Sequence, residues 1–353
     1  MAATMPPDQF TMQSLRLSTL ARVAFLSFGL SSPAVAQNSA ADYRAAVEQN
    51  FTQWVGRLRG DAVSRGIGPE TFDGAMKGVT LNWKLPDLAP PELGPGQPER
   101  PRVEKKDRRK QQAEFDRPAR YFPKKGLKWI TRLGRENLAK WKDTLKAIEK
   151  KYGVEPQIVL AIWGRETAFG RAKLPYNAVR ALATLAFMGR RQEKFREELF
   201  IALGILQEGH VTRARMRSSW AGAMGHTQFI PTTYAAYAVD FTGNGRRDIW
   251  GSIPDALAST ANYLKVSKWR PGETWGYEVD LPKGFDYALT GRKRIKTLKG
   301  WQKLGVKRAK GKRFPRPDDR ASIILPAGAK GPAFAIINNF KNTVNLFIRQ
   351  RHW

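Results

Sequence analysis

The sequence of 353 residues contains no cysteine. Disulfide bonds, a catalytic thiolate, cysteine-ligated metals and a lipid attached to an N-terminal cysteine are therefore excluded. Histidine is scarce as well, because His210, His226 and His352 are the only three and they are scattered. This scarcity argues against a histidine metal cage and against a Ser-His-Asp catalytic centre.

Acidic residues are few relative to basic ones. The sequence has 31 Asp and Glu residues and 61 Lys and Arg residues, which gives a formal net charge of +30. Such an excess attracts an anionic partner: nucleic acid, anionic lipid or an acidic polymer such as cell wall. The stretch 292–313 has no acidic residue. Because Trp301 is its single aromatic residue, a solvated basic face is favoured there over a nucleic-acid-binding surface.

The chain has no apolar run long enough for a permanent membrane-spanning helix. Its N-terminus instead predicts an export signal over residues 1–36. Arg16 and Arg22 supply positive charge, an apolar run covers 23–30, and Ala34-Val35-Ala36 matches the small-x-small cleavage pattern. We therefore expect a periplasmic protein without a transmembrane helix in its mature chain.

Composition and periodicity divide the remaining chain into four parts. Residues 37–83 predict a helical region, with a short second helix from Pro69 to Met76, and residues 84–120 form a connection rich in proline and charge. A densely helical core follows over 121–270. Residues 271–353 form a basic subdomain whose short alternating runs indicate a few strands. The expected fold class is mainly α (α+β), with a small C-terminal α/β subdomain.

The most informative stretch of the core is 154–170. Pro156 suits the first turn of a helix, and Ile158, Ile162 and Glu166 fall four residues apart on one face. Glu166 thus ends an apolar stripe near the negative end of a helix, and Gly170 offers a stop signal. Both surroundings disfavour the ionised carboxylate, as a general acid requires. On spacing alone, a solvent-facing glutamate on an amphipathic helix is the favoured interpretation.

Two later segments contain candidate binding groups. Arg190 and Arg191 follow an Ala-rich helical pattern, where they would cap a helix or bind an anionic or sugar ligand. In the segment 218–231, glycines allow close approach of a ligand, and Ser219 and Gln228 offer hydrogen bonds. A packed junction between a helix and a loop explains the second segment equally well.

The segment starting at Asp240 resembles the front of a calcium loop. Oxygen-bearing residues fall at its positions 1, 3 and 5, glycine is at position 6 and a carboxylate is at position 9. Position 12 is Gly251 in place of the glutamate of an EF-hand, so Asp255 would have to close the site. An Asx-rich turn that caps the next helix is the alternative.

Taken together, these segments resemble the lytic murein transglycosylase B family, exported bacterial enzymes with a lysozyme-like catalytic domain. The resemblance covers most of the mature chain in order. Its matching segments are 161–167, 183–187 with Arg190 and Arg191, 219–231, 237–264, 300–306, 325–328 and 331–334.

The resemblance implies that residues 121–270 are a lysozyme-like catalytic core. It also implies cleavage of peptidoglycan glycan strands between N-acetylmuramic acid and N-acetylglucosamine, with formation of a 1,6-anhydro ring. Glu166 would act first as general acid and then as base. The implied substrate contacts are Ser219, Gln228, Arg190, Arg191 and Tyr121. The implied calcium ligands are Asp240, Thr242, Asn244, the Arg246 carbonyl and Asp255.

Residues 341–353 do not match the family pattern, so one wall of the substrate groove is expected to differ. The partners implied are glycan strands, with other cell-wall enzymes as further candidates, and no nucleic acid. The main alternative is a non-catalytic protein that binds peptidoglycan or acts as a scaffold on it. A nucleic-acid-binding role for 292–313 is disfavoured by the export signal.

Overall fold

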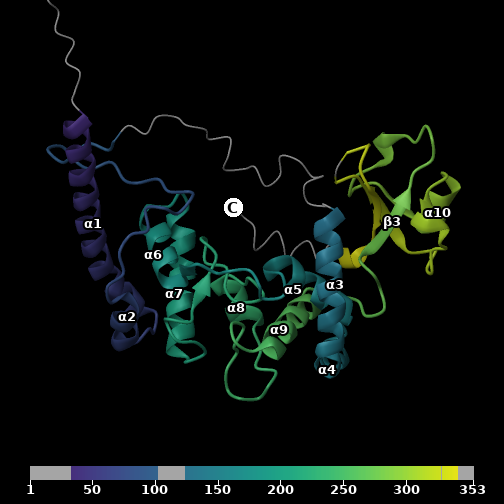
Figure 1. Ribbon diagram of the computed structural model, residues 1–353, viewed down its shortest axis with the longest axis horizontal. Coiled ribbons are helices and arrows are strands. Elements are labelled where there is room, and N and C mark those ends of the chain that lie inside the picture. Colours follow the sequence, from purple (N-terminus) through teal and green to yellow (C-terminus); the bar gives the residue numbers. More distant parts are fainter. Residues whose placement is uncertain (1–32, 102–123, 327, 341–353) are drawn as a thin grey trace, which may run out of the picture.

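The structure, a computed structural model, describes residues 33–101, 124–326 and 328–340 (Figure 1). It begins with α1 (Pro33–Ser64) and α2 (Pro69–Met76), where Pro69 occupies the first turn. The bounds of α2 are those predicted for the short second helix, and α1 begins four residues before the helical region predicted from residue 37. The expected export signal lies outside the described residues except for the start of α1, and it stays a prediction. No helix of the described ranges is long and apolar enough to cross a membrane.

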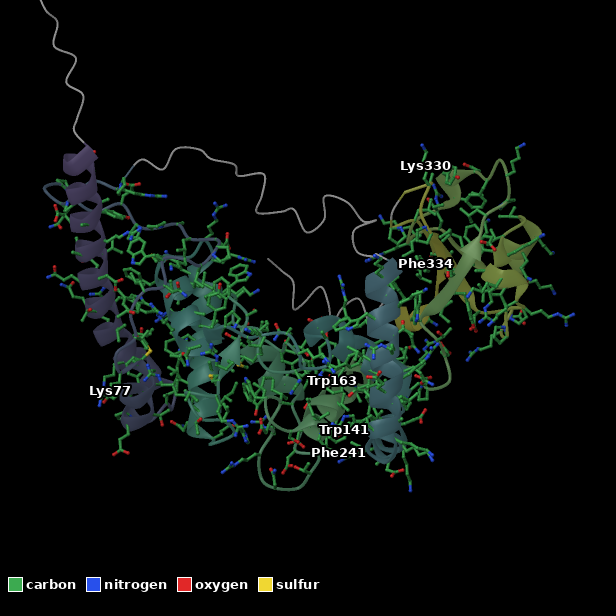
Figure 2. The ribbon with its side chains drawn as sticks, viewed as in Figure 1. Lys77, Trp141, Trp163, Phe241, Lys330 and Phe334 are labelled. Atoms are coloured by element: carbon green, nitrogen blue, oxygen red, sulfur yellow. The ribbon has the colours of Figure 1, made fainter. Side chains whose placement is uncertain are left out.

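The middle of the molecule is helical. Trp163 and Trp141 lie in this part (Figure 2). The sequence predicts a densely helical core here, but it gives no sign of the helix break at Trp141. The helices are α3 (Lys124–Lys140), α4 (Lys142–Tyr152), α5 (Pro156–Thr167), α6 (Ala178–Met188), α7 (Gln192–Gln207), α8 (Pro231–Tyr237) and α9 (Ile253–Val266).

A short antiparallel ladder joins two parts of this helical region. Strand β1 (Tyr176–Asn177) pairs with β2 (Arg217–Ser218). The Asn177 side chain caps α6 by accepting a hydrogen bond from the N–H of Arg180 at 3.1 Å. The ladder therefore fixes the start of α6 to the beginning of the segment 218–230. Strands of two residues are too short for their alternation to be visible in a sequence.

The C-terminal part is a five-stranded antiparallel sheet with strand order β4-β6-β7-β3-β5. All its neighbouring strands run antiparallel, so the subdomain has the α+β arrangement. Trp301 of the short helix α10 is fully buried and donates through its indole N–H to the carbonyl of Ala321. Its elements are β3 (Gly276–Asp280), η3 (Tyr287–Leu289), β4 (Ile295–Thr297), α10 (Leu298–Lys303), β5 (Lys307–Arg308), η4 (Ala309–Gly311), β6 (Arg320–Ile324) and β7 (Ala333–Ile336).

The buried apolar side chains form two separate clusters. The first runs from Tyr43 to Trp269 and joins α1 and α2 to the central helices. The second runs from Tyr277 to Ile337 within the C-terminal sheet. Figure 1 shows α1 and the sheet at opposite ends of the molecule, with α5 between them. The N-terminal helices therefore share their core with the helix that carries Glu166.

Asn339 joins the sheet to the helical part. It is completely buried and accepts a hydrogen bond from the N–H of Arg270 at 2.9 Å. Its Nδ2 group donates to the carbonyls of Arg270 and Glu273. Arg270 directly follows Trp269, the last residue of the first cluster. One amide side chain therefore satisfies three backbone groups at the boundary between the two clusters.

We expect Asn339→Ala to lower the free energy of unfolding by about 2–3 kcal/mol, because it leaves buried backbone groups without partners. Denaturation in urea measures this loss. Asn338→Ala is the matched control, since Asn338 is the exposed neighbour. Equal stability of the two variants would contradict the role of Asn339 as a joint.

Candidate active site

Helix α5 is followed directly by three residues whose backbone is in the left-handed region. Ala168, Phe169 and Gly170 have φ angles of 50°, 59° and 80°. Residues other than glycine adopt this region at a cost of about 1 kcal/mol or more each. The stretch 154–170 predicts that the helix stops at Gly170, but the helix ends at Thr167. It ends earlier because Ala168 already forms a left-handed cap, with its N–H donating to the Gly164 carbonyl at 3.0 Å.

The left-handed run folds the ring of Phe169 back against α5. A Cβ atom on Gly164 would lie 2.7 Å from Cζ of Phe169, so the glycine leaves the room that the ring needs. The same ring meets Trp163 edge to face, with ring centroids 5.2 Å apart. Gly164 and Phe169 of the motif therefore pack together as one unit beside Glu166.

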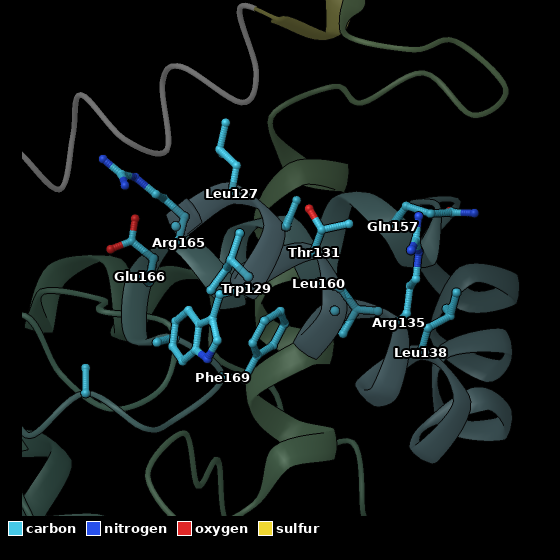
Figure 3. Close-up of a pocket in the computed structure, with 17 residues that line it drawn as sticks. Leu127, Trp129, Thr131, Arg135, Leu138, Gln157, Leu160, Arg165, Glu166 and Phe169 are labelled. Carbon is cyan, nitrogen blue, oxygen red and sulfur yellow. The ribbon is translucent and has the colours of Figure 1, made fainter. Parts of the chain in front are cut away.

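Glu166 lies in the last turn of α5 and is half-buried, and its Oε1 atom is buried. It lines a cavity of about 760 Å³ between α3 and α5, whose wall includes Trp129, Leu160 and Phe169. Figure 3 shows its carboxylate at one end of this cavity, beside Arg165. Among the described residues that line the cavity, Glu166 is the only carboxylate. These mostly apolar walls agree with the surroundings that the sequence predicts for this side chain.

The segment 218–230 packs directly under the end of α5. The indole N–H of Trp163 donates to Nδ1 of His226 at 3.1 Å, and the Thr167 hydroxyl donates to the His226 carbonyl at 3.1 Å. A Cβ atom on Gly170 would lie 2.4 Å from Cε1 of His226. His226 therefore holds the helix end on two sides, and Gly170 is needed because the imidazole occupies the space of a side chain.

The imidazole of His226 has to be neutral to accept this hydrogen bond. Burial lowers its pKa below the ordinary 6.5, and Asp248 and a backbone hydrogen bond to Trp250 only partly oppose the shift. Since Nδ1 accepts from Trp163, the proton of the neutral ring resides on Nε2. Protonation of Nδ1 would remove the acceptor and break the contact with α5.

Ser219 and Gln228, the predicted sugar contacts, lie in the segment that His226 anchors to α5. The Ser219 hydroxyl oxygen is half-buried and accepts from the N–H of Ala223 at 3.1 Å. Gln228 is buried, and its Nε2 group donates to the carbonyls of Ala223 at 3.2 Å and Gly225 at 3.0 Å. Gln228 therefore holds the turn of this loop, and only its amide oxygen is left to meet a sugar. Both substrate contacts stay predictions.

Arg190 and Arg191 lie in the turn between α6 and α7. Both guanidinium groups pair with Asp87, at 3.5 Å for Arg190 and 3.1 Å for Arg191. These ion pairs attach the connection after α2 to this turn. The sequence had suggested helix capping or ligand binding for the two arginines and did not indicate this role. Their contact with substrate stays a prediction. Tyr121, the remaining predicted contact, lies outside the described residues.

The predicted calcium loop is built around two carboxylates. Asp240 accepts hydrogen bonds from the N–H groups of Gly243 and Gly245, each at 2.7 Å. Desolvation would raise its pKa, but the hydrogen bonds from Gly245, Gly243 and Asn244 outweigh that effect and lower it. The buried Asp255 accepts from the N–H groups of Phe241 and Thr242. Both carboxylates therefore accept hydrogen bonds from the backbone of the loop.

This donor set fits a calcium ion. The expected ligands are the two carboxylates and the neutral oxygens of Thr242, Asn244 and Arg246, which is a mixture that calcium accepts. Within the described ranges, no group of three or more His, Asp or Glu residues could hold a metal. Any ion here would therefore depend on neutral oxygens for most of its ligands, and the five assigned ligands stay predictions.

The positioning residues around α5 were missed by the sequence analysis. Trp163 and Thr167 belong to the same motif as Glu166, yet the motif does not indicate their partner. That partner, His226, is 63 residues away from Trp163 in the chain. The only available signal was the isolated polar group of His226 within a segment of small residues. Asp87, the partner of both arginines, has no signal of this kind.

The fold and this site define a class: lysozyme-like proteins of the lytic transglycosylase type. Residues 50–345 match the family described as "Transglycosylase SLT domain", and the chain belongs to that family. It is 38% identical over 151 residues to membrane-bound lytic murein transglycosylase B of Escherichia coli. This match covers 41% of this chain and 42% of that protein, so it spans less than half the length of the curated relative.

Solved structures agree with this assignment. SltB3 from Pseudomonas aeruginosa, in complex with NAG-NAM-pentapeptide, matches with a TM-score of 0.71 and 39% identity over 86% of this chain and 75% of that chain. Lytic transglycosylase Slt35 of Escherichia coli, in complex with calcium, matches with a TM-score of 0.53 and 27% identity over 67% of this chain and 72% of that chain. The resemblance and the fold class drawn from the sequence are thereby confirmed.

We expect acidification below pH 6.5 to destabilise the wild-type protein more than His226→Gln. The unfolded histidine takes up a proton near pH 6.5, whereas the folded one resists it. The stability that depends on the neutral ring is therefore complete above pH 6.5 and is lost as the pH falls toward the folded pKa. Glutamine keeps an acceptor for Trp163 and does not titrate. Urea denaturation across this range measures the difference.

His226→Phe serves as the control, because it fills the space but removes the acceptor. It should lose about 1–3 kcal/mol of stability at neutral pH, where glutamine retains the hydrogen bond. Parallel pH profiles for the wild type and His226→Gln would show that the imidazole does not hold α5 in this way.

Proposed function

We propose that this protein is a peptidoglycan lytic transglycosylase that uses Glu166 as its single catalytic carboxylate. The observation that carries the proposal is the half-buried Glu166 at the end of a mostly apolar cavity, without a second carboxylate among the described lining residues. Glycosidases commonly need two carboxylates, of which the second activates water or attacks the sugar. A substrate that supplies its own nucleophile needs only one. The relatives are lytic transglycosylases, and SltB3 is solved with NAG-NAM-pentapeptide.

The reaction runs in two proton transfers at the same carboxyl group. Glu166 first gives its proton to the oxygen of the bond between N-acetylmuramic acid and N-acetylglucosamine, and the bond from C1 to that oxygen breaks. The C6 hydroxyl oxygen of the muramic acid then bonds to C1, and its proton passes to Glu166. Glu166 thus regains its starting state and water is not consumed. Apolar walls favour the protonated carboxyl that the first step requires.

The expected place of action is the periplasmic cell wall. The export signal predicted for residues 1–36 supports this location, and the net charge of +30 favours association with an acidic wall polymer. Other cell-wall enzymes remain candidate partners on the same grounds. The charge alone would equally serve a non-catalytic protein that binds peptidoglycan, which is the second candidate function.

Digestion of purified sacculi by wild type and by Glu166→Gln separates these functions. We expect the wild type to release 1,6-anhydromuropeptides and the variant to be slower by at least about a hundredfold, the usual contribution of a general acid. Product analysis by mass spectrometry measures the release. Glutamine keeps the size of the side chain, so the variant should retain its thermal midpoint.

Arg165→Gln, one residue away and also lining the cavity, tests whether the effect is specific to the carboxylate. It should alter the rate far less than Glu166→Gln. Equal release by the wild type and Glu166→Gln would remove Glu166 from the mechanism. Binding of both proteins to sacculi without any product would instead favour the non-catalytic function.

We also propose that the loop from Asp240 to Asp255 binds calcium as a structural ion. Support comes from its two carboxylates and from Slt35, whose structure holds calcium. When bound, the ion would be held by Asp240, Thr242, Asn244, the Arg246 carbonyl and Asp255. It would tie the loop to the start of α9.

We expect calcium to stabilise the wild type, by about 2.7 kcal/mol at a concentration a hundred times its dissociation constant. Asp240→Asn should lose this gain, because it removes one of two carboxylates. Thermal midpoints with calcium and with a chelator measure it. Asp280→Asn, an exposed aspartate in β3, is the control. Equal calcium responses in both variants would rule out this loop as the calcium site.

A further inference from the structure

A second hollow, far from Glu166, has the composition of a sugar-binding surface. It has a volume of about 610 Å³ and lies between α1, the segment 91–97 and the turn from α6 to α7. Figure 1 shows α1 at the end of the molecule opposite the C-terminal sheet, with α5 between them. The hollow is therefore separate from the cavity that Glu166 lines.

One face of α1 supplies the floor of this hollow. Asn50, Gln53 and Trp54 line it together, and their spacing of three and four residues places them on one side of the helix. Gln97 and Gln192 approach from the other two segments. The side chains of these four amides make no hydrogen bond to another residue of the described ranges. These exposed donors and acceptors are therefore available to a ligand in the hollow.

An aromatic platform lies beside these amides. Trp54 packs on the buried Phe51, with centroids 5.7 Å apart and planes 24° apart, and on Phe187 with centroids 5.6 Å apart. Trp54 and Phe187 are each half-buried, and both line the hollow. The contacts among the three rings hold Trp54 and Phe187 in place and leave part of each of these two rings exposed. A flat, fixed ring is a surface on which the apolar face of a pyranose can stack.

The charge of the hollow selects a neutral ligand. Among its described lining residues, only Arg57 and Glu92 are charged, and they are of opposite sign. This balance contrasts with the net charge of +30 for the whole chain. Amide groups both donate and accept hydrogen bonds, which suits hydroxyl and acetamido groups. A polyanion or an acidic peptide would find no excess of positive charge here.

The geometry points to a second saccharide-binding site, which takes N-acetylated sugars of the glycan strand at a distance from the cleavage point. This inference rests on the proposed function for its substrate class. The aromatic rings would stack on a sugar, and the amides of Gln53 and Gln192 would bind its hydroxyl and acetamido groups. A long strand held at both places would dissociate more slowly than a short one.

Calorimetric titration of the full-length Glu166→Gln protein with a tetramer of β-1,4-linked N-acetylglucosamine tests the site. We expect two binding events per chain, one of which weakens at least tenfold when Gln53→Ala and Gln192→Ala are added. These two side chains are exposed, so the fold should persist. Trp54→Ala should weaken the same event. Gln302→Ala, an exposed amide on α10, is the matched control and should leave both events intact.

The two hypotheses fail in different ways. If wild type releases no anhydro products while the second binding event is present and sensitive to Gln53 and Gln192, the proposed function fails and the saccharide site stands. A single binding event, or a second event insensitive to all three substitutions, overturns the site whatever the activity. Preferential binding of an acidic peptide at the hollow also overturns it.

Discussion

The arrangement of the site depends on the contact of His226 with the end of α5, in which its imidazole accepts from the indole of Trp163 and its carbonyl from the hydroxyl of Thr167. It links the last turns of α5 to the segment that contains Ser219 and Gln228. The left-handed run after Thr167 is strained, and such strain persists only where the surrounding structure holds it in place. His226 does this through its ring and its carbonyl. The position of Glu166 therefore follows from contacts that its neighbours Trp163 and Thr167 make in the last turn of α5.

Much of the helical fold could be predicted from the sequence because its signals are local. Pro69 and Pro156, which mark helix starts, are signals contained in short windows of sequence. Glu166 was also accessible, since its helix face and apolar surroundings follow from spacing, and the family resemblance strengthened that interpretation. The antiparallel sheet was predicted only in outline, because its strands contain two to five residues.

The contacts that hold the site together could not be predicted. His226 meets Trp163 across 63 residues, and Asp87 meets Arg190 and Arg191 across more than 100 residues. No periodicity or spacing encodes such pairs. Gln228 illustrates the same limit, because the sequence predicted a sugar contact whereas the fold directs its amide nitrogen to two backbone carbonyls. Local patterns identify chemical groups, and only the packed chain decides which of them remain available to a ligand.

The division of the buried side chains into two clusters has a consequence for how such a chain can change over generations. The sheet has its own core around Trp301, and no buried side chain belongs to both clusters. An insertion, loss or exchange of the sheet would therefore disturb little beyond the Asn339 joint. By contrast, α1 and α2 share the core of α5, so ancestral recombination could not replace them without refitting α5.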